Sequence, residues 1–139
     1  MHYAASLEIT TTDTITSPAE LVVHMGAGVI RKCQLIFPPG CARTVCLVVF
    51  KGADQVLPTN PEMYYSEDGQ SILIDCYIPL NIADNKITLY GWSNGSTYDH
   101  VITAYFDVEG PDEPNLHILL LSLVDVIQQA IDIVKRWFY

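Results

Sequence analysis

The hydrophobic pattern changes its period once along the 139 residues of this chain, and the change divides the chain into two parts. Up to about residue 109, short runs alternate apolar and polar side chains and end at turn residues, as in an antiparallel β-sandwich or barrel. After residues 109–115 the spacing of apolar residues becomes that of an α-helix. We therefore expect a mainly β fold, an antiparallel β-sandwich of jelly-roll or Ig-like type over residues 1–110, with one long C-terminal amphipathic α-helix over residues 111–139 that serves oligomerisation or docking.

Several runs with one apolar face predict individual strands. They lie near residues 7–9, 21–25, 29–37, 45–50, 72–78, 87–93 and 100–108, with a short one at 63–65 inside a long surface excursion over 51–70. The run 45–50 is apolar on both faces, which predicts a central strand. Residues 94–97 read Asn-Gly-Ser-Thr, and Asn-Gly favours a type I′ turn, in which both central residues have positive φ. We therefore predict that the last two strands pair as a hairpin.

The C-terminal residues carry the signals of a helix with a broad apolar face. Asp112 can cap its N-terminus, Pro114 is tolerated in its first turn, and Lys135 and Arg136 suit the negative end of its dipole. A heptad seam runs through Leu116, Leu120, Leu123, Ile127, Ala130, Val134 and Trp137. Flanking rows widen it, with Leu119, Val126 and Ile133 on one side and Val124, Ile131 and Phe138 on the other. The apolar sector is thus wider than a two-stranded seam needs.

Three surfaces could bury the apolar face of this helix: another subunit, the chain's own sheet or a membrane. A helix of about 25 residues would run roughly 37 Å, longer than the face of a small sandwich, so we predict packing between subunits. Folding back onto its own sheet is the alternative. We do not expect a membrane, because the helix is too polar to span one and carries few Lys and Arg residues. The predicted interface residues are Leu116, Leu119, Leu120, Leu123, Val126, Ile127, Ala130, Ile133, Val134 and Trp137.

Charge and cysteine spacing exclude some classes of partner. The formal net charge of −9 argues against direct nucleic-acid binding, which needs Lys and Arg against the phosphates. The N-terminal residues lack the pattern of a secretory signal, so we expect synthesis in a cytoplasm. Cys33, Cys41, Cys46 and Cys76 lack zinc-ligand spacing, and we expect buried free thiols. A bridge involving Cys41 or Cys46 stays open under oxidising conditions.

Motifs that carry catalysis are missing from the sequence. The chain has no GxSxG, HExxH, P-loop or GxGxxG pattern in a suitable context, and its histidines are scattered. We therefore expect no enzyme, no metal and no cofactor. Tyr90 and Trp92 share one strand face beside Tyr98, which makes them a candidate sugar-stacking platform or contact surface; aromatic pairs that stabilise the sheet are the other explanation.

Several short motifs lie between residues 28 and 108. They are Val29-Ile30, then Phe37-Pro38-Pro39-Gly40, the segment from Gln55 to Pro58, and the late run Tyr98-Asp99-His100. Together they resemble motifs of small virion structural proteins of tailed bacteriophages. The resemblance implies a capsid decoration or connector protein with a β-sandwich body, present in many symmetric copies, and it supplies no functional residues.

Together these observations give two hypotheses of function. The first is a non-enzymatic virion structural or accessory protein that self-assembles, with a trimer as one candidate, and docks on other virion or capsid proteins through its C-terminal helix. Its location would be the virion. The alternative is a carbohydrate-type ligand-binding β-sandwich module that uses Tyr90, Trp92 and Tyr98.

Overall fold

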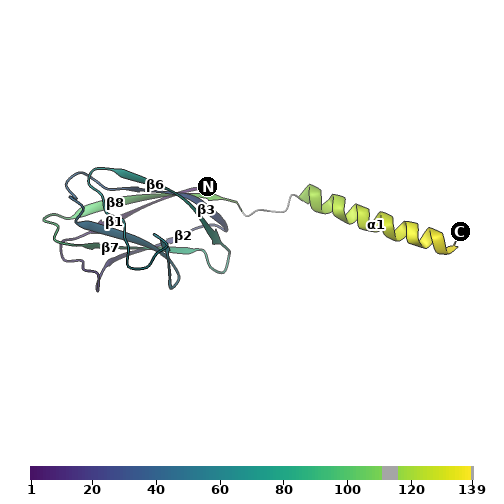
Figure 1. Ribbon diagram of the computed structural model, residues 1–139, viewed down its shortest axis with the longest axis horizontal. Helices are drawn as coiled ribbons and strands as arrows, with labels where there is room; N and C mark the ends of the chain where they lie inside the picture. Colours follow the sequence, from purple (N-terminus) through teal and green to yellow (C-terminus); the bar gives the residue numbers. More distant parts are fainter. Residues whose placement is uncertain (111–115, 139) are drawn as a thin grey trace.

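Two antiparallel sheets of four strands each form a sandwich (Figure 1). The computed structural model describes residues 1–110 and 116–138. The strands are β1 (His2–Ile9), β2 (Ala19–His24), β3 (Gly28–Ile36), β4 (Val45–Lys51), β5 (Asp54–Leu57), β6 (Ser71–Leu80), β7 (Lys86–Ser93) and β8 (His100–Glu109). One sheet has the order β1-β8-β3-β6 and the other β2-β7-β4-β5. This is the eight-stranded order of a jelly roll, so the predicted mainly β sandwich is confirmed in its jelly-roll form rather than its Ig-like form.

Alternate side chains of both sheets fill the space between them. Along β8, for example, Ile102, Ala104 and Phe106 are buried while Val101 and Tyr105 are exposed. The buried cluster draws all its members from the sandwich, between Ala5 and Val108, and none from the helix side chains that are described, 120–138. Among the described residues no polar or charged side chain is buried. The sandwich therefore has a complete core of its own, as a domain of this size requires.

The two sheets approach each other closely at Gly91 of β7. A Cβ atom built there would lie 2.7 Å from Cγ1 of Ile9, a buried residue of β1, and 3.2 Å from Leu7. No real side chain tolerates the first of these distances unless Ile9 moves. Only glycine lets β7 pass under β1 at this spacing.

The predicted hairpin at residues 94–97 is wrong. β7 pairs with β2 and β4, whereas β8 pairs with β1 and β3, so the connection crosses from one sheet to the other. Within 94–97 only Gly95 has a positive φ, so the type I′ turn is not formed. The N–H of Asn94 instead donates to the carbonyl of Thr44 at 2.6 Å. An Asn-Gly signal is local, and two strands that bury one face in the same core show the same alternation whichever partners they choose.

The excursion over residues 51–70 holds a strand that the sequence did not reveal. β5 pairs with the end of β4 from Val49 to Lys51, and further along Tyr65 exchanges two backbone hydrogen bonds with Leu47, at 3.0 and 2.9 Å. The strand predicted at 63–65 is thus a single bridge. β5 is too short, at four residues, to show an alternation. β4 lies between β5 and β7, so its prediction as a central strand is confirmed.

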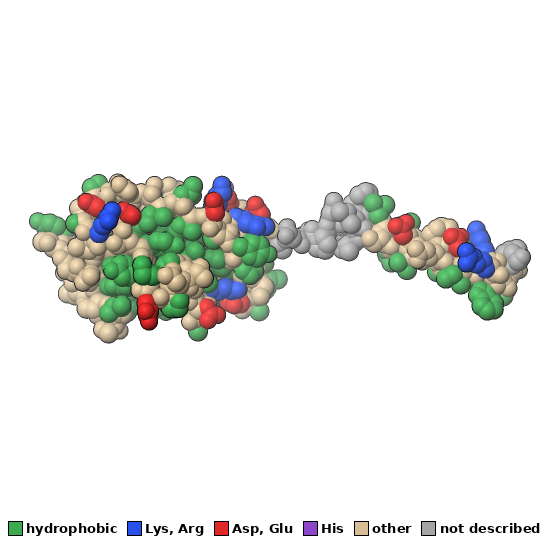
Figure 2. Space-filling view, in the orientation of Figure 1, with side chains coloured by type: hydrophobic (Ala, Val, Ile, Leu, Met, Phe, Trp, Pro, Cys, Tyr) green, Lys and Arg blue, Asp and Glu red, His purple; other side chains and the backbone are tan. Residues whose placement is uncertain are grey.

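The C-terminal helix α1 (Leu116–Phe138) forms as predicted. Figure 1 shows it away from the sandwich, and every described side chain, from 120 to 138, is exposed. Figure 2 shows apolar side chains along one side of the helix and charged ones along the other. The predicted cap at Asp112 and Pro114 lies outside the described residues. Within residues 1–110 and 116–138, no helix is both long and apolar enough to cross a membrane.

Candidate functional site

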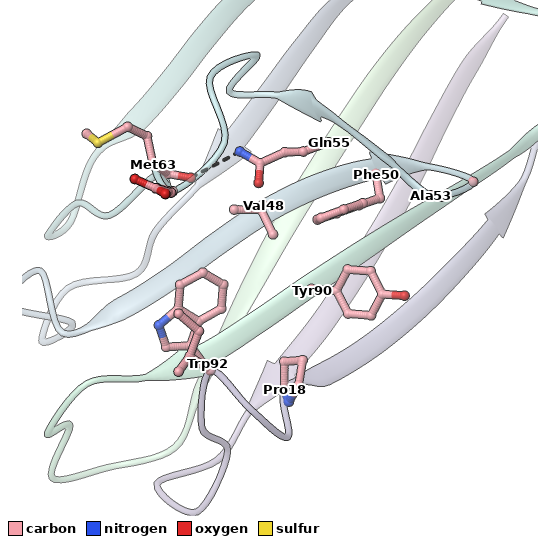
Figure 3. A pocket seen from close by; sticks show the side chains of 11 residues that line it. Pro18, Val48, Phe50, Ala53, Gln55, Met63, Tyr90 and Trp92 are labelled. Carbon is pink, nitrogen blue, oxygen red and sulfur yellow. Dashed lines mark hydrogen bonds between the residues drawn. The ribbon is translucent and has the colours of Figure 1, made fainter.

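A hollow of about 420 Å³ opens on the outer face of the β2-β7-β4-β5 sheet (Figure 3). Its floor consists of Val48 and Phe50 from β4 and of Tyr90 and Trp92 from β7. These residues point outward because their neighbours along each strand, such as Leu89, fill the core. Val48 lies opposite Tyr90 in the register of the two strands, so the floor is continuous across them.

Two loops line the hollow on opposite sides of this floor and form its walls. Ile15 and Pro18 come from the segment before β2, and Glu62 and Met63 from the segment between β5 and β6. Figure 3 shows Pro18 and Met63 on opposite sides of the aromatic rings. The lining is completed by the turn into β5, with Gly52, Ala53 and Gln55. The hollow therefore depends on loop structure as well as on the sheet.

Gln55 holds the second wall in place. Its side-chain nitrogen donates to the carbonyls of Pro58 at 2.8 Å, Met63 at 3.1 Å and Asn60 at 3.2 Å. Three acceptors around one end of the amide identify that end as the nitrogen. The amide oxygen at the other end accepts no hydrogen bond from the described residues, and in Figure 3 it points toward Val48. One side chain thus fixes the loop and presents an acceptor to the hollow.

The aromatic rings of the floor are held by edge-to-face contacts. Phe50 and Tyr90 have ring centroids 5.2 Å apart with planes at 90°, and Tyr64 and Trp92 are 5.6 Å apart at 73°. Such pairs are stabilising beyond the area they bury. The Phe50–Tyr90 pair joins two strands, so these aromatics brace the sheet, as the other explanation expected, while they also line the hollow.

The surroundings of the hollow are acidic. Glu62 belongs to the lining, and Glu20 lies directly opposite Tyr90 in the register of β2 and β7. No Lys, Arg or His side chain is among the lining residues that the structure describes. Glu62 also has a φ of 76°, which a non-glycine residue seldom adopts and which is often found at functional sites.

The structure brings together two of the three aromatic residues singled out in the sequence. Tyr90 and Trp92 both line the hollow, whereas Tyr98 lies in the crossing segment, 71% exposed, and is not part of the lining. The sequence did not identify Phe50, although its place in a strand that is apolar on both faces was a signal for an outward apolar residue. Nothing in the sequence pointed to Glu62.

The predicted interface residues of α1 all lie at exposed positions wherever their side chains are described. These are Leu120, Leu123, Val126, Ile127, Ala130, Ile133, Val134 and Trp137. The side chains of Leu116 and Leu119 fall outside the described part. The hollow and the apolar side of α1 are thus separate candidate sites.

The cysteines are free thiols, and Cys33, Cys41 and Cys46 are buried. Burial, together with the neighbouring Cys76, raises the pKa of Cys33 to about 12, and burial raises the pKa of Cys46 to about 11. Both therefore stay protonated near neutral pH and are poor nucleophiles and metal ligands. Among the described residues no group of His, Cys, Asp and Glu side chains is arranged to hold a metal ion.

No protein-family model matches the sequence, and no curated protein is similar to it in sequence. Solved structures that are similar include hydroxypropylphosphonic acid epoxidase from S. wedmorenis, with 8% identity and a TM-score of 0.40 over 76% of this chain and 43% of that one. A Yersinia pseudotuberculosis-derived mitogen has 8% identity and a TM-score of 0.42 over 78% and 86% of the two chains. The PRD1 vertex protein P5 has 10% identity and a TM-score of 0.42 over 76% and 96%. The chain spans less than half the length of the epoxidase, and likenesses this distant support no particular activity.

The prediction that the chain is not an enzyme is corrected by these comparisons. The finding that overturns it is that an epoxidase is among the similar solved structures. The prediction relied on missing short motifs. Missing motifs do not exclude catalysis, because catalytic side chains can come from separate strands and then leave no contiguous motif.

Proposed function

We propose that the chain is a structural protein of a virion, whose copies assemble through α1 and display the jelly-roll body. The exposed apolar side of the helix carries the proposal: Leu123 is 55% exposed, Ile127 51% and Trp137 81%. Full burial of each such side chain stabilises by about 1.5–3 kcal/mol. The body has a complete core without the helix, so the gain is available to contacts between chains.

The width of the apolar side favours a bundle over a pair of helices. At 3.6 residues per turn, the apolar residues from Ile133 through Leu123 to Val124 span an arc of about 180° with no polar side chain within it. A helix that packs against one core needs a stripe of roughly 100°, and the seam between two helices is narrower still. In a symmetric bundle of three or more copies each helix has two neighbours in different directions, so a wider arc is covered.

The virion assignment is supported by chemistry and by the resemblance in sequence. Jelly rolls recur in viral capsid domains. The net charge of −9 would repel packaged DNA, which suits a position on the outside of a particle. Other virion or capsid proteins are the proposed neighbours of the assembly. We expect genes for capsid, portal or terminase proteins beside this one, and a purely metabolic neighbourhood would contradict the assignment.

Light scattering on the full chain tests the assembly. We expect a mass of three or more protomers and a monomer for a chain that ends at Gly110. Ile127→Asp places a charge in the centre of the apolar side and should dissociate the assembly. Gln129→Asp adds the same charge on the polar side and should leave it intact. A monomeric full chain, or an assembly that ignores Ile127→Asp, would overturn the proposal.

A further inference from the structure

We propose that the hollow over Val48 binds an organic cation, an alkylammonium group carried on an apolar stem. The inference goes beyond the assembly role and does not depend on it, because the hollow lies entirely within the body. Its volume of about 420 Å³ falls within the range of small-molecule sites, roughly 300–1,000 Å³.

The aromatic floor supplies the first reason. Phe50, Tyr90 and Trp92 line one hollow, and a cation near the face of such rings is attracted by their quadrupoles. Recognition of quaternary ammonium groups by several aromatic rings rests on the same interaction. Trp92 has an edge-to-face contact with Tyr64, and Phe50 has one with Tyr90. These contacts hold the rings in place before a ligand binds, which lowers the entropic cost of binding.

The polar groups supply the second reason. The lining includes Glu62, whose carboxylate is an acceptor, and Gln55, whose amide oxygen accepts no hydrogen bond from the described residues; Glu20 lies beside Tyr90 on the next strand. A lining that binds a neutral ligand with hydroxyl groups would contain hydrogen-bond donors as well as acceptors. Acidic side chains with no basic residue in the described lining complement a positive charge instead, and the net charge of −9 adds a long-range attraction for cations.

The loop that carries Glu62 is held in place by hydrogen bonds from Gln55. Gln55 ties the loop at Pro58, Asn60 and Met63, on both sides of Glu62. The positive φ of Glu62 places a strained, non-glycine residue at the rim, where glycine would be the undemanding choice. Both observations fit a carboxylate whose position matters for a ligand.

The decisive comparison is between choline and 3,3-dimethylbutan-1-ol, its neutral analogue with carbon in place of nitrogen. Calorimetry on the full chain should show choline binding at least about tenfold more tightly than the analogue. Equal affinity for the two, or no binding of choline, would overturn the proposal. Binding of methyl glucosides in place of choline would also overturn it and would favour the carbohydrate alternative.

Matched variants locate the binding in the hollow. Trp92→Ala should abolish choline binding, whereas Trp137→Ala and Tyr98→Ala, which change aromatic residues outside the lining, should not alter it. Glu62→Gln is an exposed, nearly isosteric change that leaves the fold intact, and it should weaken binding about three- to tenfold. Unchanged affinity in both Trp92→Ala and Glu62→Gln would refute the site.

Two further probes distinguish the source of the cation. Vesicles of phosphatidylcholine present it as a lipid headgroup, and a peptide with trimethyllysine presents it on a protein. Competition by choline against whichever probe binds shows that the hollow is responsible. The same measurements on Ile127→Asp separate the two proposals, because that variant should lose assembly and keep choline affinity.

Discussion

The sandwich buries apolar side chains in its core, whereas the helix exposes the apolar side chains that are described. In the body, Phe37 and Phe106 are about 1% exposed, whereas the described apolar residues of α1 are all exposed. The same residue types therefore have different consequences in the two parts. Apolar residues of the body determine whether a single chain folds, and under the proposal above those of the helix would determine how many chains associate. An isolated helix of this length is marginal in water, so we expect the helix to gain its stability from the assembly.

The largest effect that would test this difference is expected in the core. Phe106→Ala removes a fully buried ring from the centre of β8 and should lower the free energy of unfolding of the body by about 3–5 kcal/mol. Denaturant unfolding of the chain that ends at Gly110 measures it without any contribution from assembly. A loss below about 1 kcal/mol would mean that the core is not packed as described.

A smaller loss is expected where the sheets approach each other. Gly91→Ala inserts a methyl group against Ile9 and should destabilise the body by about 1–3 kcal/mol through overpacking. Gly110→Ala is the matched control, because no other part of the described chain lies within 4 Å of the added methyl group and the residue has no positive φ. Equal stabilities of the two variants would contradict the close approach of β1 and β7.

The buried thiols give the body a dependence on alkaline pH that the helix lacks. The pKa of Cys33 is about 12 in the folded chain and 9.0 ordinarily, so the stability from its protonated form is complete below about pH 9 and is lost as the pH rises toward 12. The slope should approach about 1.4 kcal/mol per pH unit. Comparing Cys33→Ala with the native chain by unfolding at pH 8 to about 11 should show a flatter curve for the variant. Parallel curves would rule out this contribution.

The smallest effect on the body should come from the helix. Trp137→Ala should leave the unfolding free energy of the sandwich within about 0.5 kcal/mol of the native value. It should nevertheless shift association toward the monomer, because an 81% exposed indole loses only contacts with other chains. A clear loss of body stability at a concentration where the chain is monomeric would show that the helix packs on its own sheet after all.

Much of the fold could be predicted because the sequence shows both the two-residue hydrophobic period of strands and the 3.6-residue period of a helix. Strands β3, β4 and β6 carry alternations long enough to detect, and α1 carries a seam over its whole length. Strand partners could not be predicted in this way. The Asn-Gly segment before β8 favoured a hairpin, yet the pairing of β8 with β1 and β3 depends on contacts far apart in sequence, for which a local turn is no guide.

The candidate site was only partly accessible to prediction. Tyr90 and Trp92 share a strand face, so alternation alone places them together. Phe50 joins them only through the register of β4 with β7, and Glu62 only through a loop whose course depends on the Gln55 amide. Sites assembled across strands and loops require the tertiary structure before their members can be named.

The close passage at Gly91 has a consequence for tracing the ancestry of the chain. The space for any side chain at 91 is taken by Ile9, so the two positions are coupled although they lie at opposite ends of the body's sequence. Distant descendants of a common ancestor should keep the glycine, or change both positions together. Such a compensated pair would reveal kinship between sequences that have otherwise diverged beyond recognition.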